Sequence, residues 1–169
     1  MRAFSKPRAT IWDMDGTMLD TERLTIECWE QVCVTRGYAD PRATLCKLIG
    51  RTTLDCDKIL QADFGPGFDP QLLRAEKNVL AERRMLKDGI PLKAGVGPAL
   101  QWLSDRAIPS AVASSTYRET VLSHLQQAGL LDFFATVTGG DQVQRGKPDP
   151  EIFLATADRL KAKPAECLV

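Results

Sequence analysis

Four short, apolar, β-prone runs separated by helical stretches constrain the fold of this chain more than any other feature. The runs are residues 9–12, 110–113, 135–138 and 167–169. Strands that alternate with helices are typical of a parallel sheet, because a helix is the usual connection that returns the chain to the same end of the sheet. We therefore predict an α/β fold with a Rossmann-like parallel sheet. Ligands of such sheets bind beyond the carboxyl ends of the strands.

The segment between the first two runs is much longer than the others and has helical patterns throughout. We predict that residues 21–89 form an inserted, all-helical cap, and that residues 1–20 and 90–169 form one discontinuous core. Asp40-Pro41 and Asp69-Pro70 each predict an N-cap followed by proline at the first helical position. Four apolar residues would mark one face of the helix that begins at Pro70: Leu72, Val79, Leu80 and Leu86.

Charge and composition exclude several classes of protein. The 169 residues carry 22 Lys and Arg against 22 Asp and Glu, so no excess charge indicates a nucleic acid or membrane partner. No apolar run approaches the length of a membrane span or follows the N-terminus as in a signal peptide. We therefore expect a cytoplasmic protein; its oligomeric state is left open.

Five cysteines without C-x-x-C spacing favour reduced, packed thiols: Cys28, Cys33, Cys46, Cys56 and Cys167.

Two carboxylates follow the first apolar run, in Asp13-Met14-Asp15-Gly16-Thr17. Residues i and i+2 of an extended backbone point to the same side, so Asp13 and Asp15 can face one ligand. Gly16 permits a sharp turn after them. A pair of carboxylates also suits a hard cation such as Mg²⁺. On its own the pattern would equally describe two solvated aspartates in a loop.

Hydroxyl groups follow the second run. Ser114, Ser115 and Thr116 stand between a strand and a predicted helix that covers residues 117–127. Hydroxyls and backbone amides at such a place suit a phosphate group or another anion. The alternative for Ser114 is an ordinary helix N-cap.

A lysine follows the third run, within Gly146-Lys147-Pro148-Asp149-Pro150. Because parallel strands end at one edge of the sheet, Lys147 can lie beside the carboxylates and neutralise a phosphoryl group. For a lone lysine, a surface position before a capped helix is the favoured alternative. His124 is the single histidine, which excludes a zinc site built on several histidines.

Together these three motifs resemble the haloacid dehalogenase superfamily. The resemblance covers the whole chain, in the family's order. The segment 21–89 looks like the helical cap of β-phosphoglucomutase-like and phosphoglycolate phosphatase-like members, and Gly50-Arg51-Thr52 within it is similar to theirs. An acid two residues after the nucleophile favours phosphate esters over dehalogenation, because an alkoxide leaving group needs a proton and a halide does not.

The resemblance implies a role for each site residue. Asp13 would be the nucleophile and Asp15 the general acid and base, while Ser114 and Lys147 would hold the phosphoryl oxygens. Mg²⁺ would bind the Asp13 carboxylate and the Asp15 backbone carbonyl. Three further residues would contact the substrate: Thr17, Arg51 and Ser115. For Arg51 a solvated loop is an equal alternative.

These roles predict a Mg²⁺-dependent phosphatase that hydrolyses a small phosphorylated metabolite. A β-phosphoglucomutase-like phosphotransferase is the alternative. The family's fourth motif, an acidic pair after the fourth strand, is not in the sequence, which ends at Val169. We therefore expect the chain to be part of a longer protein, and a catalytically incomplete fragment is the third possibility.

Overall fold

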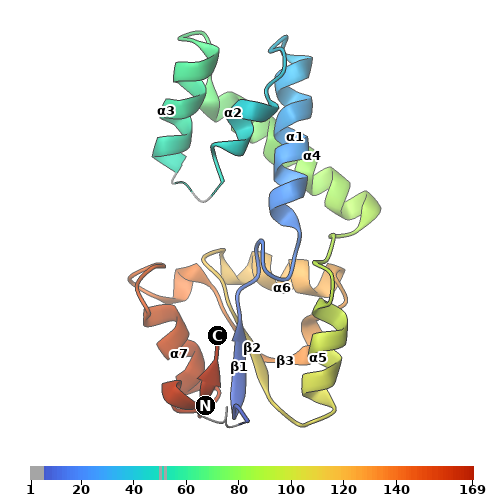
Figure 1. Ribbon diagram of the computed structural model, residues 1–169, viewed down its shortest axis with the longest axis vertical. Coiled ribbons are helices and arrows are strands. Elements are labelled where there is room, and N and C mark those ends of the chain that lie inside the picture. Colours follow the sequence, from blue (N-terminus) through green and yellow to red (C-terminus); the bar gives the residue numbers. More distant parts are fainter. Residues whose placement is uncertain (1–5, 50, 52) are drawn as a thin grey trace, which may run out of the picture. The chain divides into compact units, whose positions relative to one another are not determined.

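The computed structural model describes residues 6–169 except residues 50 and 52. The chain divides into two compact units. One consists of Met1–Asp20 and Ile90–Val169, and the other is Thr21–Gly89 (Figure 1). The first unit is called the α/β unit below, and the second the helical unit.

A four-stranded, wholly parallel sheet organises the α/β unit. It consists of β1 (Ala9–Trp12), β2 (Ser110–Ala113), β3 (Phe134–Thr138) and β4 (Cys167–Leu168), in the order β3-β2-β1-β4. This confirms the predicted α/β fold with a parallel sheet. All four residues of β2 are buried, as expected of a central strand in a sheet that is covered on both faces.

Helices cover both faces of this sheet. They are α5 (Val96–Ser104), α6 (Arg118–Gln127) and α7 (Glu151–Arg159), with short 3₁₀ turns η1 (Leu131–Phe133), η2 (Gly140–Gln142) and η3 (Pro164–Glu166). Crossovers between parallel strands are right-handed. The chain moves outward from β1 to β3 and then back to β4, so α7 lies on the face opposite α5 (Figure 1). Ile11 of β1 and Ala113 of β2 pack against Ile152 and Ala157 of α7.

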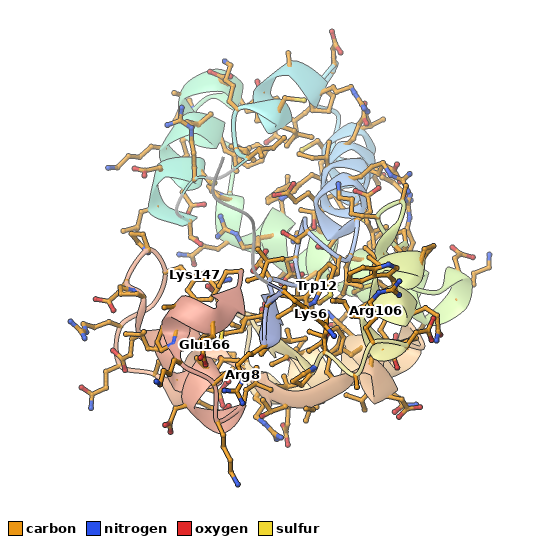
Figure 2. All side chains as sticks on the ribbon, turned by 60° about the horizontal axis from the view of Figure 1, so that its bottom comes forward. Lys6, Arg8, Trp12, Arg106, Lys147 and Glu166 are labelled. Atoms are coloured by element: carbon orange, nitrogen blue, oxygen red, sulfur yellow. The ribbon has the colours of Figure 1, made fainter. Side chains whose placement is uncertain are left out.

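Polar contacts fix the register and the edge of the sheet. The hydroxyls of Thr10 and Ser110, which face each other across β1 and β2, are hydrogen-bonded at 2.8 Å. The amide of Arg8 donates to the carbonyl of Glu166 at 2.9 Å, and their side chains form an ion pair at 3.8 Å (Figure 2). These contacts connect the start of β1 to the start of β4.

The helical unit contains α1 (Thr21–Thr35), α2 (Arg42–Cys46), α3 (Thr53–Phe64) and α4 (Pro70–Asp88). Its core consists of Trp29, Val32, Cys33, Leu45, Leu60, Phe68 and Leu73. α4 begins as predicted, because the Asp69 carboxylate accepts hydrogen bonds from the amides of Gln71 and Leu72. Within the described residues, no helix is both long and apolar enough to cross a membrane.

Two local predictions in the helical unit are wrong. Asp40 does not cap α2: Pro41 occupies the N-cap position, and Asp40 has a positive φ of 45°. The buried residues of α4 are Pro70, Leu73 and Ala81, whereas Leu72, Val79 and Leu86 are exposed. Of the four predicted residues, only Leu80 packs against the core, where it is partly buried, so most of the apolar stripe read from the sequence is not the face that packs.

Candidate active site

A tight turn after β1 presents the two aspartates. Gly16 has a φ of 76°, a conformation that side chains with a Cβ rarely adopt. The amides of Met18 and Leu19 both donate to the carbonyl of Met14, at 2.9 and 3.0 Å. All three of these apolar side chains are fully buried. The turn is therefore anchored in the core, while Asp15 is exposed and Asp13 half-buried.

Both carboxylate oxygens of Asp13 accept hydrogen bonds. Lys147 Nζ donates to Oδ1 at 2.5 Å, and Thr17 Oγ1 donates to Oδ2 at 3.0 Å. Lys147 Nζ also donates to the carbonyl of Ala113, the last residue of β2, at 3.0 Å. The structure thus brings together the ends of β1 and β2 and the loop after β3.

The loop that carries Lys147 is held by Glu151, the first residue of α7. The Glu151 carboxylate accepts hydrogen bonds from the amides of Gln144 and Arg145 at 2.8 and 3.2 Å, and from Arg145 Nε at 3.1 Å. The backbone hydrogen bond from Gln144, followed by the Arg145 guanidinium, lowers the pKa of Glu151. Lys147 Nζ lies 4.9 Å from the centre of the ring of Phe153, which is in the first turn of α7.

The carboxylate of Asp15 contacts the loop after β2. Thr116 Oγ1 donates to Asp15 Oδ2 at 3.0 Å. The Thr116 amide donates to Ser114 Oγ at 3.1 Å, and the Ser114 amide donates to the carbonyl of Thr138 at 3.0 Å. Ser114 is buried, while Ser115 is exposed. Ser114 is not the N-cap of α6, which begins four residues later, at Arg118.

Four residues of this region were not singled out as site residues from the sequence. Thr116 lies against Asp15, and Gly139, Gly140 and Asp141 support the loop that carries it. A Cβ on Gly139 would lie 2.3 Å from the Arg118 amide nitrogen, and one on Gly140 would lie 2.2 Å from the Ser115 carbonyl oxygen. Consecutive glycines directly after the third predicted strand were the available signal, because they allow a close backbone approach.

Arg51 belongs to the helical unit, where it is exposed and its Nε donates to the carbonyl of Lys47 at 2.9 Å. Its neighbours in the sequence motif, Gly50 and Thr52, lie outside the described residues. The contact between Arg51 and a substrate therefore remains a prediction.

The donor set beside Asp13 fits a magnesium ion of the kind that binds together with phosphate. Mg²⁺ keeps several waters and takes one or two carboxylates, with the phosphate oxygens of the substrate completing its shell. Asp13 supplies a carboxylate and Asp15 a backbone carbonyl, and both residues follow the carboxyl end of β1. Within the described residues, no group of three or more His, Cys, Asp or Glu side chains surrounds a common point.

The cluster combines two carboxyl groups, an ammonium group and hydroxyl groups. Asp13 is a carboxylate held at both oxygens, and Asp15 is a second carboxyl group two residues away. Lys147 supplies positive charge, and Ser114 and Thr116 supply hydroxyls. Such a set can attack an electrophilic centre and stabilise the negative charge of a phosphoryl group that is being transferred.

Comparisons with known proteins point to one family. Residues 10–169 match the family model described as haloacid dehalogenase-like hydrolase. A phosphorylated carbohydrates phosphatase of Thermotoga maritima is 31% identical over 166 residues, which cover 95% of this chain and 74% of that protein. A fructose-1-phosphate phosphatase of Escherichia coli is 33% identical over 164 residues, which cover 94% and 83%.

A solved structure has the same fold. It is a Thermotoga maritima protein described as a "putative beta-phosphoglucomutase", with a TM-score of 0.78 and 29% identity. The match covers 95% of this chain and 74% of that one. The parallel sheet, the residues gathered at its carboxyl edge and the match along almost the whole chain lead to one conclusion: the chain belongs to the haloacid dehalogenase-like hydrolase family.

Proposed function

We propose that this protein is a Mg²⁺-dependent phosphatase that hydrolyses a small phosphorylated metabolite through an aspartyl-phosphate on Asp13. The observation that carries the proposal is the contact of Asp13 with Lys147, at a distance of 2.5 Å, beside the second carboxyl group of Asp15. The neighbouring cation reduces the repulsion between a carboxylate and an incoming phosphate dianion. Family membership supports the same assignment.

The first half-reaction transfers the phosphoryl group to the protein. An Asp13 carboxylate oxygen forms a bond to phosphorus as the bond from phosphorus to the leaving oxygen breaks. Protonated Asp15 gives its proton to that oxygen, so that an alcohol departs rather than an alkoxide. Lys147 and the Ser114 hydroxyl interact with the phosphoryl oxygens, whose negative charge is spread over the group during transfer.

The second half-reaction uses the same residues in reverse roles. Asp15, now ionised, accepts a proton from water as the water oxygen attacks phosphorus. The bond between Asp13 and phosphorus breaks, which releases inorganic phosphate and restores both side chains. One residue can serve both steps because the acid of the first step is the base of the second.

The Asp13 carboxylate and the Asp15 backbone carbonyl would hold Mg²⁺. When bound, the ion offsets charge repulsion between the nucleophile and the phosphate and helps to orient the phosphoryl group. Thr17, Ser115 and Arg51 would contact the substrate. Arg51 would do so from the helical unit, where its guanidinium could recognise a second anionic group of the metabolite.

The names of the relatives support a phosphorylated sugar or polyol as the substrate class. Two of them are named for phosphorylated carbohydrates and for fructose 1-phosphate. A phosphotransferase is the second candidate, favoured by the Thermotoga maritima structure described as a phosphoglucomutase. The two candidates share the aspartyl-phosphate and differ in the acceptor: a phosphatase transfers the group to water, and a mutase transfers it to a sugar phosphate.

Replacement of the nucleophile tests the proposal. We expect Asp13→Asn to abolish Mg²⁺-dependent release of phosphate from p-nitrophenyl phosphate, because the amide cannot form the phosphoenzyme. Asp132→Asn, the same change at an exposed position in η1, is the matched control and should leave turnover intact. Turnover by Asp13→Asn at the rate of the control would refute the proposal. A doubly phosphorylated sugar formed from a trapped phosphoenzyme and a sugar monophosphate would favour the mutase.

A further inference from the structure

The hydroxyl of Thr116 bridges two segments that are 101 residues apart in the sequence. It donates to Asp15 Oδ2 at 3.0 Å, from the loop between β2 and α6. The proposed function uses Ser114 and Ser115 from this loop and gives Thr116 no role. Thr116 is half-buried, whereas its neighbour Ser115 is exposed.

Thr116 itself is held from two directions. Its amide donates to Ser114 Oγ at 3.1 Å, and its carbonyl accepts a hydrogen bond from the Gly140 amide at 2.9 Å. A Cβ at Gly140 would lie 2.2 Å from the Ser115 carbonyl oxygen. The two loops therefore touch through their backbones, and a glycine is required for this approach.

The carboxylate of Asp141, in the loop that follows β3, also fixes the start of α6. Tyr117, at the N-cap position, makes no side-chain cap hydrogen bond. The amide of Arg118 instead donates to Asp141 Oδ1 at 2.7 Å. Asp141 thus satisfies, from outside the helix, one of the amides at the start of α6 that have no partner within the helix. The Thr116 hydroxyl is consequently carried on a rigid support, as an accurate hydrogen-bond donor requires.

We propose that Thr116 is a positioning residue that orients Asp15 for proton transfer, an inference that rests on the proposed function of Asp15. The hydrogen bond from Thr116 to Oδ2 fixes the orientation of the Asp15 carboxyl group, which in this role faces the leaving group. Thr116 touches neither the phosphoryl group nor the nucleophile in this role.

This role predicts that the leaving group decides the cost of losing Thr116. Phenyl phosphate and p-nitrophenyl phosphate are similar in shape, but p-nitrophenolate is the more stable anion and departs with little need of a proton. We expect Thr116→Val to lower kcat/KM for phenyl phosphate about tenfold, the value of one hydrogen bond, and to lower it much less for p-nitrophenyl phosphate. Thr116→Ser keeps the hydroxyl and should restore the phenyl phosphate reaction.

Thr120→Val is the matched control, because it makes the same change at an exposed position in α6 and should leave both kcat/KM values unchanged. Thr116→Ala takes the place of Thr116→Val if the larger side chain prevents folding. Equal losses for the two esters, a change in KM alone, or no rescue by Thr116→Ser would overturn the inference.

Failure of this inference differs from failure of the proposed function. If Asp13→Asn remains active towards both esters, the proposed function is wrong. If Asp13→Asn is inactive and Thr116→Val lowers kcat/KM equally for both esters, the role of Asp13 stands. Only the role proposed for Thr116 is then wrong.

Discussion

Lys147 Nζ lies 2.5 Å from Asp13 Oδ1, although 134 positions separate the two residues in the chain. Their contact depends on the sheet: Asp13 follows β1, and Lys147 also reaches the carbonyl of Ala113 at the end of β2. The positive charge is therefore fixed by two neighbouring strands before any substrate arrives. Preorganised charge of this kind stabilises a transition state without further rearrangement.

We expect Lys147→Met to lower kcat for p-nitrophenyl phosphate by about 10²–10³-fold, the usual cost of one preorganised electrostatic contact. Lys147→Arg should not restore activity, because the planar guanidinium cannot replace a compact ammonium between Asp13 and Ala113. Steady-state kinetics of the purified variants measure both effects. Lys161→Met is the control at an exposed site of the same unit, and equal activity of the two methionine variants would contradict the role of Lys147.

The sheet and the place of the site could be predicted from the sequence because both follow from local patterns. Short apolar runs that alternate with helices predict parallel strands, and polar motifs that follow those runs must meet at one edge. Asp13 and Lys147 meet there. The start of α4 was predictable for the same reason, since Asp69 caps it through its own neighbours.

Features that depend on tertiary contacts were not predictable. Leu72, Val79 and Leu86 repeat every seven residues, yet α4 packs through Leu73 and Ala81, because contact with the other helices decides which face is buried. The hydrogen bond from Thr116 to Asp15 likewise depends on how the loop after β3 packs against the loop after β2. A Gly-Gly pair in the sequence indicates a close approach but does not name the partner.

The approach of the two loops can be tested at Gly140. We expect Gly140→Ala to lower the free energy of unfolding by about 1–3 kcal/mol, because the added Cβ would lie 2.2 Å from the Ser115 carbonyl oxygen and the loop must shift. A loop displaced by about 1 Å should also cost about 100-fold in kcat/KM. Urea unfolding and kinetics of the same preparation measure the two effects.

Gly97→Ala is the matched control for that substitution. Gly97 lies in α5, and a Cβ there meets no atom within 4 Å. Replacing a helical glycine by alanine should stabilise the protein by about 0.5–1 kcal/mol and leave activity unchanged. Equal stability of the Gly140→Ala and Gly97→Ala variants would show that the two loops do not pack as described.

The helical unit can be tested at its aromatic core. Phe68 is 1% exposed and lies 4.9 Å, between ring centres, from both Tyr38 and Phe64. We expect Phe68→Ala to destabilise this unit by about 3–5 kcal/mol, the usual cost of removing a buried phenyl ring. Trp29 belongs to the same cluster, so its fluorescence reports the transition. Leu54→Ala, at a residue that is 74% exposed, should change stability by less than about 0.5 kcal/mol.

Glu151 should make the stability of the α/β unit depend on pH. Its pKa is lowered from the ordinary value of 4.5, first by the hydrogen bond from the Gln144 amide and then by Arg145. A lowered pKa means that the ionised form stabilises the fold above pH 4.5, and that this contribution is lost as the pH falls through the pKa of the folded state. We therefore expect Glu151→Gln to be less stable than the unmodified protein at pH 7. The two proteins should approach equal stability once the pH falls below the pKa of Glu151 in the folded state.

Urea unfolding at a series of pH values measures the difference, with Glu82→Gln on the exposed face of α4 as the control. A stability gap between Glu151→Gln and the unmodified protein that stays constant or widens on acidification would contradict the hydrogen bonds assigned to this carboxylate.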